Sequence, residues 1–424
     1  MRELVARVEA ATPAGRDRGV DGLRAVAILG VVAGHWLVTA LVVDSGAVRA
    51  ASPLRSMPEL APVSWLFQTL AVFFLVGGMV AARSRAGARL AYRVWLGRRM
   101  ARLFRPVAAV VLVWVVIAVA MLAAGVRTET VGALARLVWS PLWFLLVFAV
   151  LTAATPLAAR LHPAWPLAVV ALVDLVRYGL DGPAWLGWVN VVAGWLVPYS
   201  LGASWGRGGG LPGRSEEGGP PGRAGGGGPP GRGGEGGLPG RRAGWALLLG
   251  GGAATAGLVL WAGYPAAMVG VPGAEVSNLD PPTLAAVTFG LAQCGAAVLL
   301  LGPLRRALRR PLAWAAVAPA NLSAITIFLW HQTAMIAVTA LGLFAGQALP
   351  GLHTVPDSAG WVTARLAWLP LFCVALAACC AAFRGYERPD RADARLAAAP
   401  DDGAAAPDAG AAAHDLTCPR APTT

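Results

Sequence analysis

Apolar stretches of close to 20 residues recur along the chain and are separated by short polar segments rich in arginine. A transmembrane helix needs about 20 consecutive, mainly apolar residues, so this pattern is typical of a protein that crosses a bilayer many times. We expect an all-α, polytopic membrane helix bundle of about ten transmembrane helices. The expected spans are roughly residues 25–43, 64–82, 107–124, 141–159, 164–180, 184–204, 244–262, 283–302, 314–340 and 362–383.

Composition supports this class, and the distribution of charge gives the bundle an orientation. Hydrophobic residues make up 57% of the chain, and only 13% of its residues are charged. The net charge is +13 and all 35 basic residues are arginine, but 29 of them fall into loops on one side of the expected spans. Such asymmetry follows the positive-inside rule and argues against a nucleic-acid interface. We expect a multi-pass protein of a bacterial plasma membrane, with both termini in the cytoplasm.

Two low-complexity segments divide the chain. Residues 206–243 are rich in Gly, Pro and Arg and cannot build a core, so we expect a flexible cytoplasmic linker there. Residues 386–424 are rich in Ala, Pro and Asp and are expected to form a disordered cytoplasmic tail. The other expected parts are a cytoplasmic N-terminal segment, the first six spans and the last four spans, at residues 1–24, 25–205 and 244–385.

An arginine and a histidine bracket the first apolar stretch. Arg24 stands where the stretch begins and His35 lies eleven residues deeper, which on a helix is about three turns and about 16 Å along the axis. The two side chains therefore share one helix face, and Asp21 lies on nearly the same stripe. A histidine in a membrane helix marks a functional site by default, and the alternative is a histidine that only hydrogen-bonds a neighbouring helix.

Arginines alternate with apolar residues between the second and third expected spans. The spacing over residues 92–106 predicts a basic amphipathic helix on the cytoplasmic surface, which carries Arg98, Arg99 and Arg102. Two interpretations stay open. The segment is either an anchor to lipid headgroups or a clamp for a phosphate-bearing cytoplasmic ligand, since arginine makes bidentate contacts to phosphate.

Several motifs together resemble the acyltransferase 3 family of integral-membrane acyltransferases. Members of that family carry a basic residue, ten intervening residues and a histidine in the first span, as Arg24 and His35 do here. They also carry an Arg-x-x-Arg motif after the second span, which Arg99 and Arg102 match. Two further stretches, similar to later helices of the family, are SPLWFLLVFAVLTAATPL at 140–157 and IFLWHQTAM at 327–335.

The resemblance implies a reaction and a set of roles. An acyl group would pass from cytoplasmic acyl-CoA to a hydroxyl of an extracytoplasmic or membrane-facing acceptor, a carbohydrate or glycosylated molecule. His35 would act as the general base, in a catalytic set with Arg24 and Asp21, and the arginines of the basic segment would bind the donor. Acyl-CoA is then a substrate and not a bound cofactor. The expected partners are acyl-CoA, the hydroxylated acceptor and membrane lipid, with no nucleic acid and no metal.

A second function class stays open beside the enzyme. A transporter or exporter of a lipid-linked or small amphiphilic solute would also use intramembrane His, Asp and Arg, as parts of a proton relay. The chain departs from some members of the family because residues 145–148 are apolar where those members carry a Glu-Glu motif. The identity of the acceptor therefore stays open.

Three further side chains are candidates for the acceptor side of the same cavity. They are His331, Asn321 and Trp143. We expect His331 in the outer half of the ninth span and His35 nearer the middle of the membrane, so that the two line one cavity at different depths. The alternative for His331 is a packing histidine that is hydrogen-bonded to a neighbouring helix.

Overall fold

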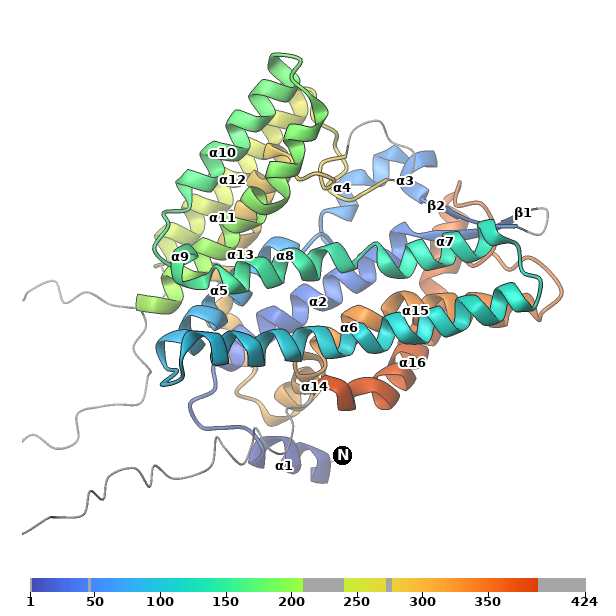
Figure 1. Ribbon diagram of the computed structural model, residues 1–424, viewed down its shortest axis with the longest axis horizontal. Coiled ribbons are helices and arrows are strands. Elements are labelled where there is room, and N and C mark those ends of the chain that lie inside the picture. Colours follow the sequence, from blue (N-terminus) through green and yellow to red (C-terminus); the bar gives the residue numbers. More distant parts are fainter. Residues whose placement is uncertain (1, 45–46, 209–239, 272–276, 388–424) are drawn as a thin grey trace, which may run out of the picture. The chain divides into compact units, whose positions relative to one another are not determined.

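The computed structural model describes residues 2–44, 47–208, 240–271 and 277–387, and these are almost entirely helical, as the apolar pattern predicts (Figure 1). Eight helical segments in these ranges are long and apolar enough to cross a membrane. The expected linker at 206–243 and tail at 386–424 lie mostly outside the described residues.

The described elements follow one another along the chain in a simple order. The helices of the first half are α1 (Arg2–Ala10), α2 (Arg18–Val38), α3 (Pro53–Ser56), α4 (Ala61–Ser64), α5 (Leu70–Ala86), α6 (Tyr92–Ala123), α7 (Thr128–Trp139), α8 (Leu142–Ala153), α9 (Thr155–Ala158), α10 (Ala164–Asp174) and α11 (Gly187–Gly208). Those of the second half are α12 (Arg241–Trp261), α13 (Leu284–Ala307), α14 (Pro311–Leu322), α15 (Ala324–Leu343) and α16 (Ala359–Phe383). One antiparallel hairpin, β1 (Ala40–Asp44) with β2 (Ala47–Ala51), follows α2.

Several of the expected spans have other bounds in the structure. Helix α5 is 17 residues long and α10 is 11 residues long, so both are shorter than the apolar runs that predicted them. The expected span at 314–340 is two helices, because α14 ends at Leu322 and α15 starts at Ala324. Ser323 stands between them and closes α14 with a 3.0 Å hydrogen bond from its N–H to the carbonyl of Pro319.

The expected helix at 92–106 is present, but it is not separate from the expected span at 107–124. Residues 92–123 form one continuous helix, α6, which runs through Pro106 (Figure 1). Proline removes one backbone hydrogen bond, and membrane helices tolerate this because neighbouring groups satisfy the freed carbonyl. The basic stretch is therefore the first half of a helix that is long and apolar enough to span.

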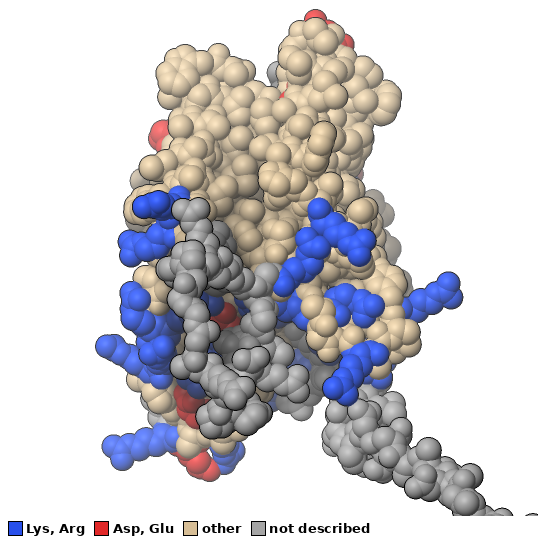
Figure 2. Space-filling model, turned by 90° about the vertical axis from the view of Figure 1, so that its left-hand side faces the viewer, with Lys and Arg blue, Asp and Glu red and all other residues tan. Residues whose placement is uncertain are grey.

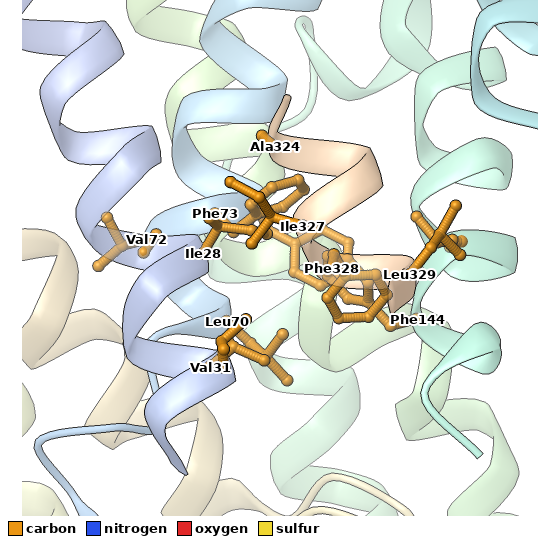
Figure 3. Close-up of a cluster of buried hydrophobic side chains, with 14 of the residues drawn as sticks. Ile28, Val31, Leu70, Val72, Phe73, Phe144, Ala324, Ile327, Phe328 and Leu329 are labelled. Carbon is orange, nitrogen blue, oxygen red and sulfur yellow. The ribbon is translucent and has the colours of Figure 1, made fainter. Parts of the chain in front are cut away.

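Helix α2 lies inside the bundle, which explains why it is apolar on most of its faces. It contacts α5, α13, α14, α15 and α16. Figure 3 shows part of the resulting core, to which α2, α5, α8 and α15 contribute side chains. The labelled core residues include Ile28 and Val31 of α2, Phe73 of α5, Phe144 of α8, and Ile327 and Phe328 of α15. A change at either end of α2 therefore acts on several helices.

The start of α2 is held by an ion-pair cluster. The Asp17 carboxylate caps the helix by accepting hydrogen bonds from the N–H groups of Gly19 and Val20. It also accepts from Arg305 of α13, at 2.6 Å and 3.1 Å. Burial on its own would raise the pKa of the Asp17 carboxyl, but the hydrogen bonds and charge of Arg305 outweigh it and hold that pKa below its ordinary value. The stability gained from this cap is therefore present at neutral pH and is lost in acid.

Helices α5 and α11 approach so closely that only glycine fits between them. A Cβ atom at Gly202 would lie 1.9 Å from the carbonyl oxygen of Leu75, and one at Gly78 would lie 2.1 Å from that of Tyr199. Small residues allow such close backbone contact between membrane helices. This contact holds α5 in place, and α5 forms one wall of the site described below.

We expect Gly202→Ala to destabilise the folded protein by about 3 kcal/mol, because the new methyl group must push two backbones apart. The measurement is the thermal unfolding temperature of the purified protein in detergent. Gly252→Ala in α12 is the matched control, since no atom lies within 4 Å of the added Cβ there. Equal unfolding temperatures for the two variants would contradict the close packing of α5 on α11.

Candidate functional site

One pocket brings the two arginine motifs together. Arg24 of α2 faces the same space as Arg99 and Arg102 of α6, and this space measures about 800 Å³ with its open mouth included. The other lining residues are mainly apolar: Phe73, Val76, Gly77, Val80, Met100, Leu103, Leu145, Phe148, Thr152 and Ile325. A pocket with three guanidinium groups and an apolar wall suits a ligand that is anionic at one end and apolar at the other.

The helical spacing of α6 explains which arginines reach the pocket. Arg99 and Arg102 are three residues apart and share a face, whereas Arg98 is turned by about 100° and is not among the lining residues. The Arg99 guanidinium lies 5.2 Å from the centre of the Trp95 ring and donates a 3.4 Å hydrogen bond to the carbonyl of Val80. Its orientation is thus set by α5 and by its own helix.

Asp21 does not join this site. Its carboxylate accepts a hydrogen bond from Nε of Arg16, in the segment before α2. Asp21 is also absent from the lining of the arginine pocket. Asp21 is therefore paired outside the arginine pocket, and its expected catalytic role with Arg24 and His35 stays a prediction.

Two histidines from different helices stand face to face. His35 lies in the last turn of α2 and His331 lies in the first half of α15. Their ring centres are 5.0 Å apart, with an angle of 42° between the ring planes. The two expected histidines are therefore neighbours, and their relative depth in a membrane stays a prediction.

The environment of His331 fixes which ring nitrogen is free. Its side chain is fully buried, and Nδ1 is hydrogen-bonded to the carbonyl of Phe328, so Nδ1 carries the hydrogen. The other nitrogen, Nε2, is buried and has no hydrogen-bond partner among the described residues. The residue His35 keeps some exposed surface, whereas His331 has none.

Three phenylalanine rings separate the arginine pocket from the histidines. Phe73 lines the pocket and lies 5.0 Å from Phe144, ring centre to ring centre. Phe144 lies 5.1 Å from Phe328, and Phe328 lies 5.7 Å from His331. All three phenylalanines are labelled in Figure 3. The pocket and the histidine pair are therefore neighbours that are joined through a layer of aromatic side chains.

The remaining candidates are Asn321 and Trp143. Asn321 is buried in α14, and its Oδ1 has no hydrogen-bond partner among the described residues. Trp143 of α8 is 36% exposed, and its ring centre lies 6.4 Å from that of Phe144 and 6.3 Å from that of Trp195. Their roles on the acceptor side stay predictions.

Arg365 is a buried residue near the site that the sequence patterns did not single out. It is 1% exposed and hydrogen-bonds the carbonyl of Trp36, the residue next to His35. The available signal was its place inside the apolar run at 362–383, where arginine is expensive. Among the described residues, no group of three or more His, Cys, Asp or Glu side chains is placed to hold a metal ion.

Comparison with known proteins identifies the family. No curated protein and no solved structure matches the chain. A family model described as an acyltransferase domain matches residues 17–384, which include both arginine motifs and both histidines. The protein is therefore a membrane protein that belongs to the acyltransferase 3 family.

Proposed function

We propose that this protein transfers an acyl group from cytoplasmic acyl-CoA to a hydroxyl of an acceptor reached from the other face of the membrane. The acceptor in this proposal is a carbohydrate or a glycosylated molecule. One observation carries the proposal: α2 takes part in both the arginine pocket, through Arg24, and the histidine pair, through His35. His35 lies eleven positions after Arg24, or about 16 Å along the helix.

The arginine pocket suits the donor. Acyl-CoA carries several phosphates at one end and its thioester at the end of a long pantetheine arm. Arg24, Arg99 and Arg102 would hold the phosphates, since guanidinium groups bind phosphate in a bidentate manner. The arm would then follow the apolar wall toward the histidines. The rings of Phe144 and Phe328 have to move aside for the thioester to arrive.

The histidine pair suits the chemistry of acyl transfer. A hydroxyl is a weak nucleophile, and neutral His35 would take its proton as the oxygen attacks the thioester carbon. The new C–O bond forms and the C–S bond breaks. The CoA thiolate then takes the proton from His35, so that the products are an ester and free CoA.

The distribution of arginines supports the direction of transfer. Arginines gather on the face of the bundle from which α6 begins (Figure 2). The positive-inside rule assigns such a face to the cytoplasm, where acyl-CoA is made. In this proposal both termini and the 206–243 segment are cytoplasmic, the chain crosses a bacterial plasma membrane ten times, and the acceptor approaches from outside.

A thiol assay separates the enzyme from the alternative transporter. Purified protein is given radiolabelled acyl-CoA with a pool of glycans extracted from the producing cells, and a thiol reagent reports free CoA. We expect CoA release that depends on the glycans, with the label transferred to them. A protein that releases no CoA but moves solute into liposomes would contradict the acyltransferase and support the transporter. A mass loss equal to one acyl group on surface glycans of cells without the protein would identify the acceptor.

A further inference from the structure

Arg365 of α16 makes an unusually complete set of contacts at the end of α2. Its Nε donates a 2.7 Å hydrogen bond to the carbonyl of Trp36, and Nη2 donates one of 2.7 Å to the carbonyl of Thr39. Nη1 donates a 2.9 Å hydrogen bond to the carbonyl of Gly351. Nη2 also lies 2.8 Å from the sulfur of Met335, which belongs to α15. One guanidinium thus connects α2, α15 and the segment before α16.

The physical setting explains why an arginine is suitable here. The last carbonyls of a helix have no partner within the helix, and in a membrane each unsatisfied group is costly. A cation at this end also interacts favourably with the helix dipole. Among the described residues the structure pairs no carboxylate with Arg365, so backbone carbonyls supply most of its hydrogen-bond acceptors. The planar fork reaches separate carbonyls at once, which a lysine ammonium cannot do in the same geometry.

Trp36 links this contact to both histidines. It follows His35 directly in α2, and its carbonyl accepts the hydrogen bond from Arg365. Its indole Nε1 donates a 2.9 Å hydrogen bond to the backbone carbonyl of His331. The Trp36 and Phe372 ring centres are 5.4 Å apart. The Arg365 guanidinium lies 4.7 Å from the centre of the Phe372 ring. The two histidine backbones are therefore joined through one residue that Arg365 holds.

We propose that Arg365 is a positioning residue that holds His35 and His331 in register by fixing Trp36 and the end of α2. The inference rests on the proposed function, in which His35 is the base. Arg365 itself touches no substrate in this account. Misplacing a reacting group by about 1 Å costs about 100-fold in rate, so loss of the guanidinium should lower kcat strongly. Donor binding lies at the other end of α2 and should be unaffected.

The test compares Arg365→Gln with Arg177→Gln as a matched control. Arg177 is half-buried, less than Arg365, and lies beside Tyr178 in the segment after α10. Among the described residues no contact joins it to the histidine pair. Each rate is divided by the amount of protein that binds CoA, so that unfolded protein does not count. We expect kcat of Arg365→Gln to fall by about 10- to 100-fold with an unchanged KM for acyl-CoA. Arg177→Gln should keep both values.

Two further variants separate positioning from general stability. Arg365→Lys keeps the charge without the fork, and we expect it to retain the kcat defect. Trp36→Phe removes the indole N–H and keeps an aromatic ring. In the double variant Trp36→Phe with Arg365→Gln, the fold loss of kcat should be smaller than the product of the fold losses of the two single variants. A wild-type kcat for Arg365→Gln or Arg365→Lys, multiplicative effects of the pair, or a defect confined to KM would each overturn the inference. His35→Ala is measured beside them: an inactive His35→Ala with a normal kcat in Arg365→Gln overturns only the positioning role, whereas a wild-type protein that releases no CoA defeats the proposed function itself.

Discussion

His35→Ala is expected to lower the rate of acyl transfer by about 10²–10⁴-fold, which is the usual contribution of a general base. The substitution removes one imidazole of the pair, and the other is fully buried with its Nδ1 engaged by Phe328. Membrane levels and donor binding should stay near normal, since the arginine pocket lies at the other end of α2. The measurement is CoA release from labelled acyl-CoA at saturating donor.

His162→Ala is the matched control for this experiment. His162 is exposed, lies before α10 and takes part in no contact with the pair. We expect it to keep wild-type activity. A loss of less than about tenfold in His35→Ala would count against a general base at this position. If His331→Ala loses the rate instead, the proton acceptor is the buried histidine.

Replacing Arg99 and Arg102 together with Gln is expected to raise the KM for acyl-CoA by about 100-fold, because hydrogen bonds to charged groups contribute about 1.5–3 kcal/mol each. The two guanidinium groups line one pocket with Arg24, and the third cation cannot replace both. The assay is run in detergent, so that anchoring to lipid headgroups plays no part.

The matched control for the double variant is Arg93→Gln with Arg105→Gln. These arginines are exposed on the same helix and do not line the pocket, so the loss of charge is equal. We expect an unchanged KM in this control. Similar KM values in both double variants would show that the basic half of α6 acts as a membrane anchor and not as a donor site.

Helix geometry and hydropathy predict one part of the site from the sequence. The eleven-residue spacing puts Arg24 and His35 on one helix, and the three-residue spacing puts Arg99 and Arg102 on one face. Both expectations agree with α2 and α6. The two motifs meet in one pocket whose walls come from α2, α5, α6, α8 and α15. Periodicity within a single helix carries no information on how these five helices pack together.

Sequence patterns could predict neither the histidine pair nor the contact of Arg365 with the end of α2, and the reasons differ. The helix that carries His331 begins after a break at Ser323, and one polar residue in an apolar run is a weak boundary signal. The number of arginines in each loop predicts the orientation of the chain in the membrane, but it does not predict which groups an arginine hydrogen-bonds. The acceptors of Arg365 are mostly backbone carbonyls, which every residue has. Only the folded chain shows that its guanidinium reaches the end of α2.

The sidedness of donor use tests the central claim most directly. Two variants are made in a protein that lacks the native cysteines. One carries Ser277→Cys and the other a single cysteine within residues 209–239, and both are probed on intact cells with a membrane-impermeant maleimide. Ser277→Cys should label and the other cysteine should not.

Acyl-CoA, which does not cross bilayers, is then added to sealed vesicles of either orientation. The account predicts CoA release in inside-out vesicles, and in right-side-out vesicles only after they are permeabilised. CoA release in sealed right-side-out vesicles, or the reverse labelling pattern, would place the arginine pocket on the outer face and contradict transfer from cytoplasmic acyl-CoA.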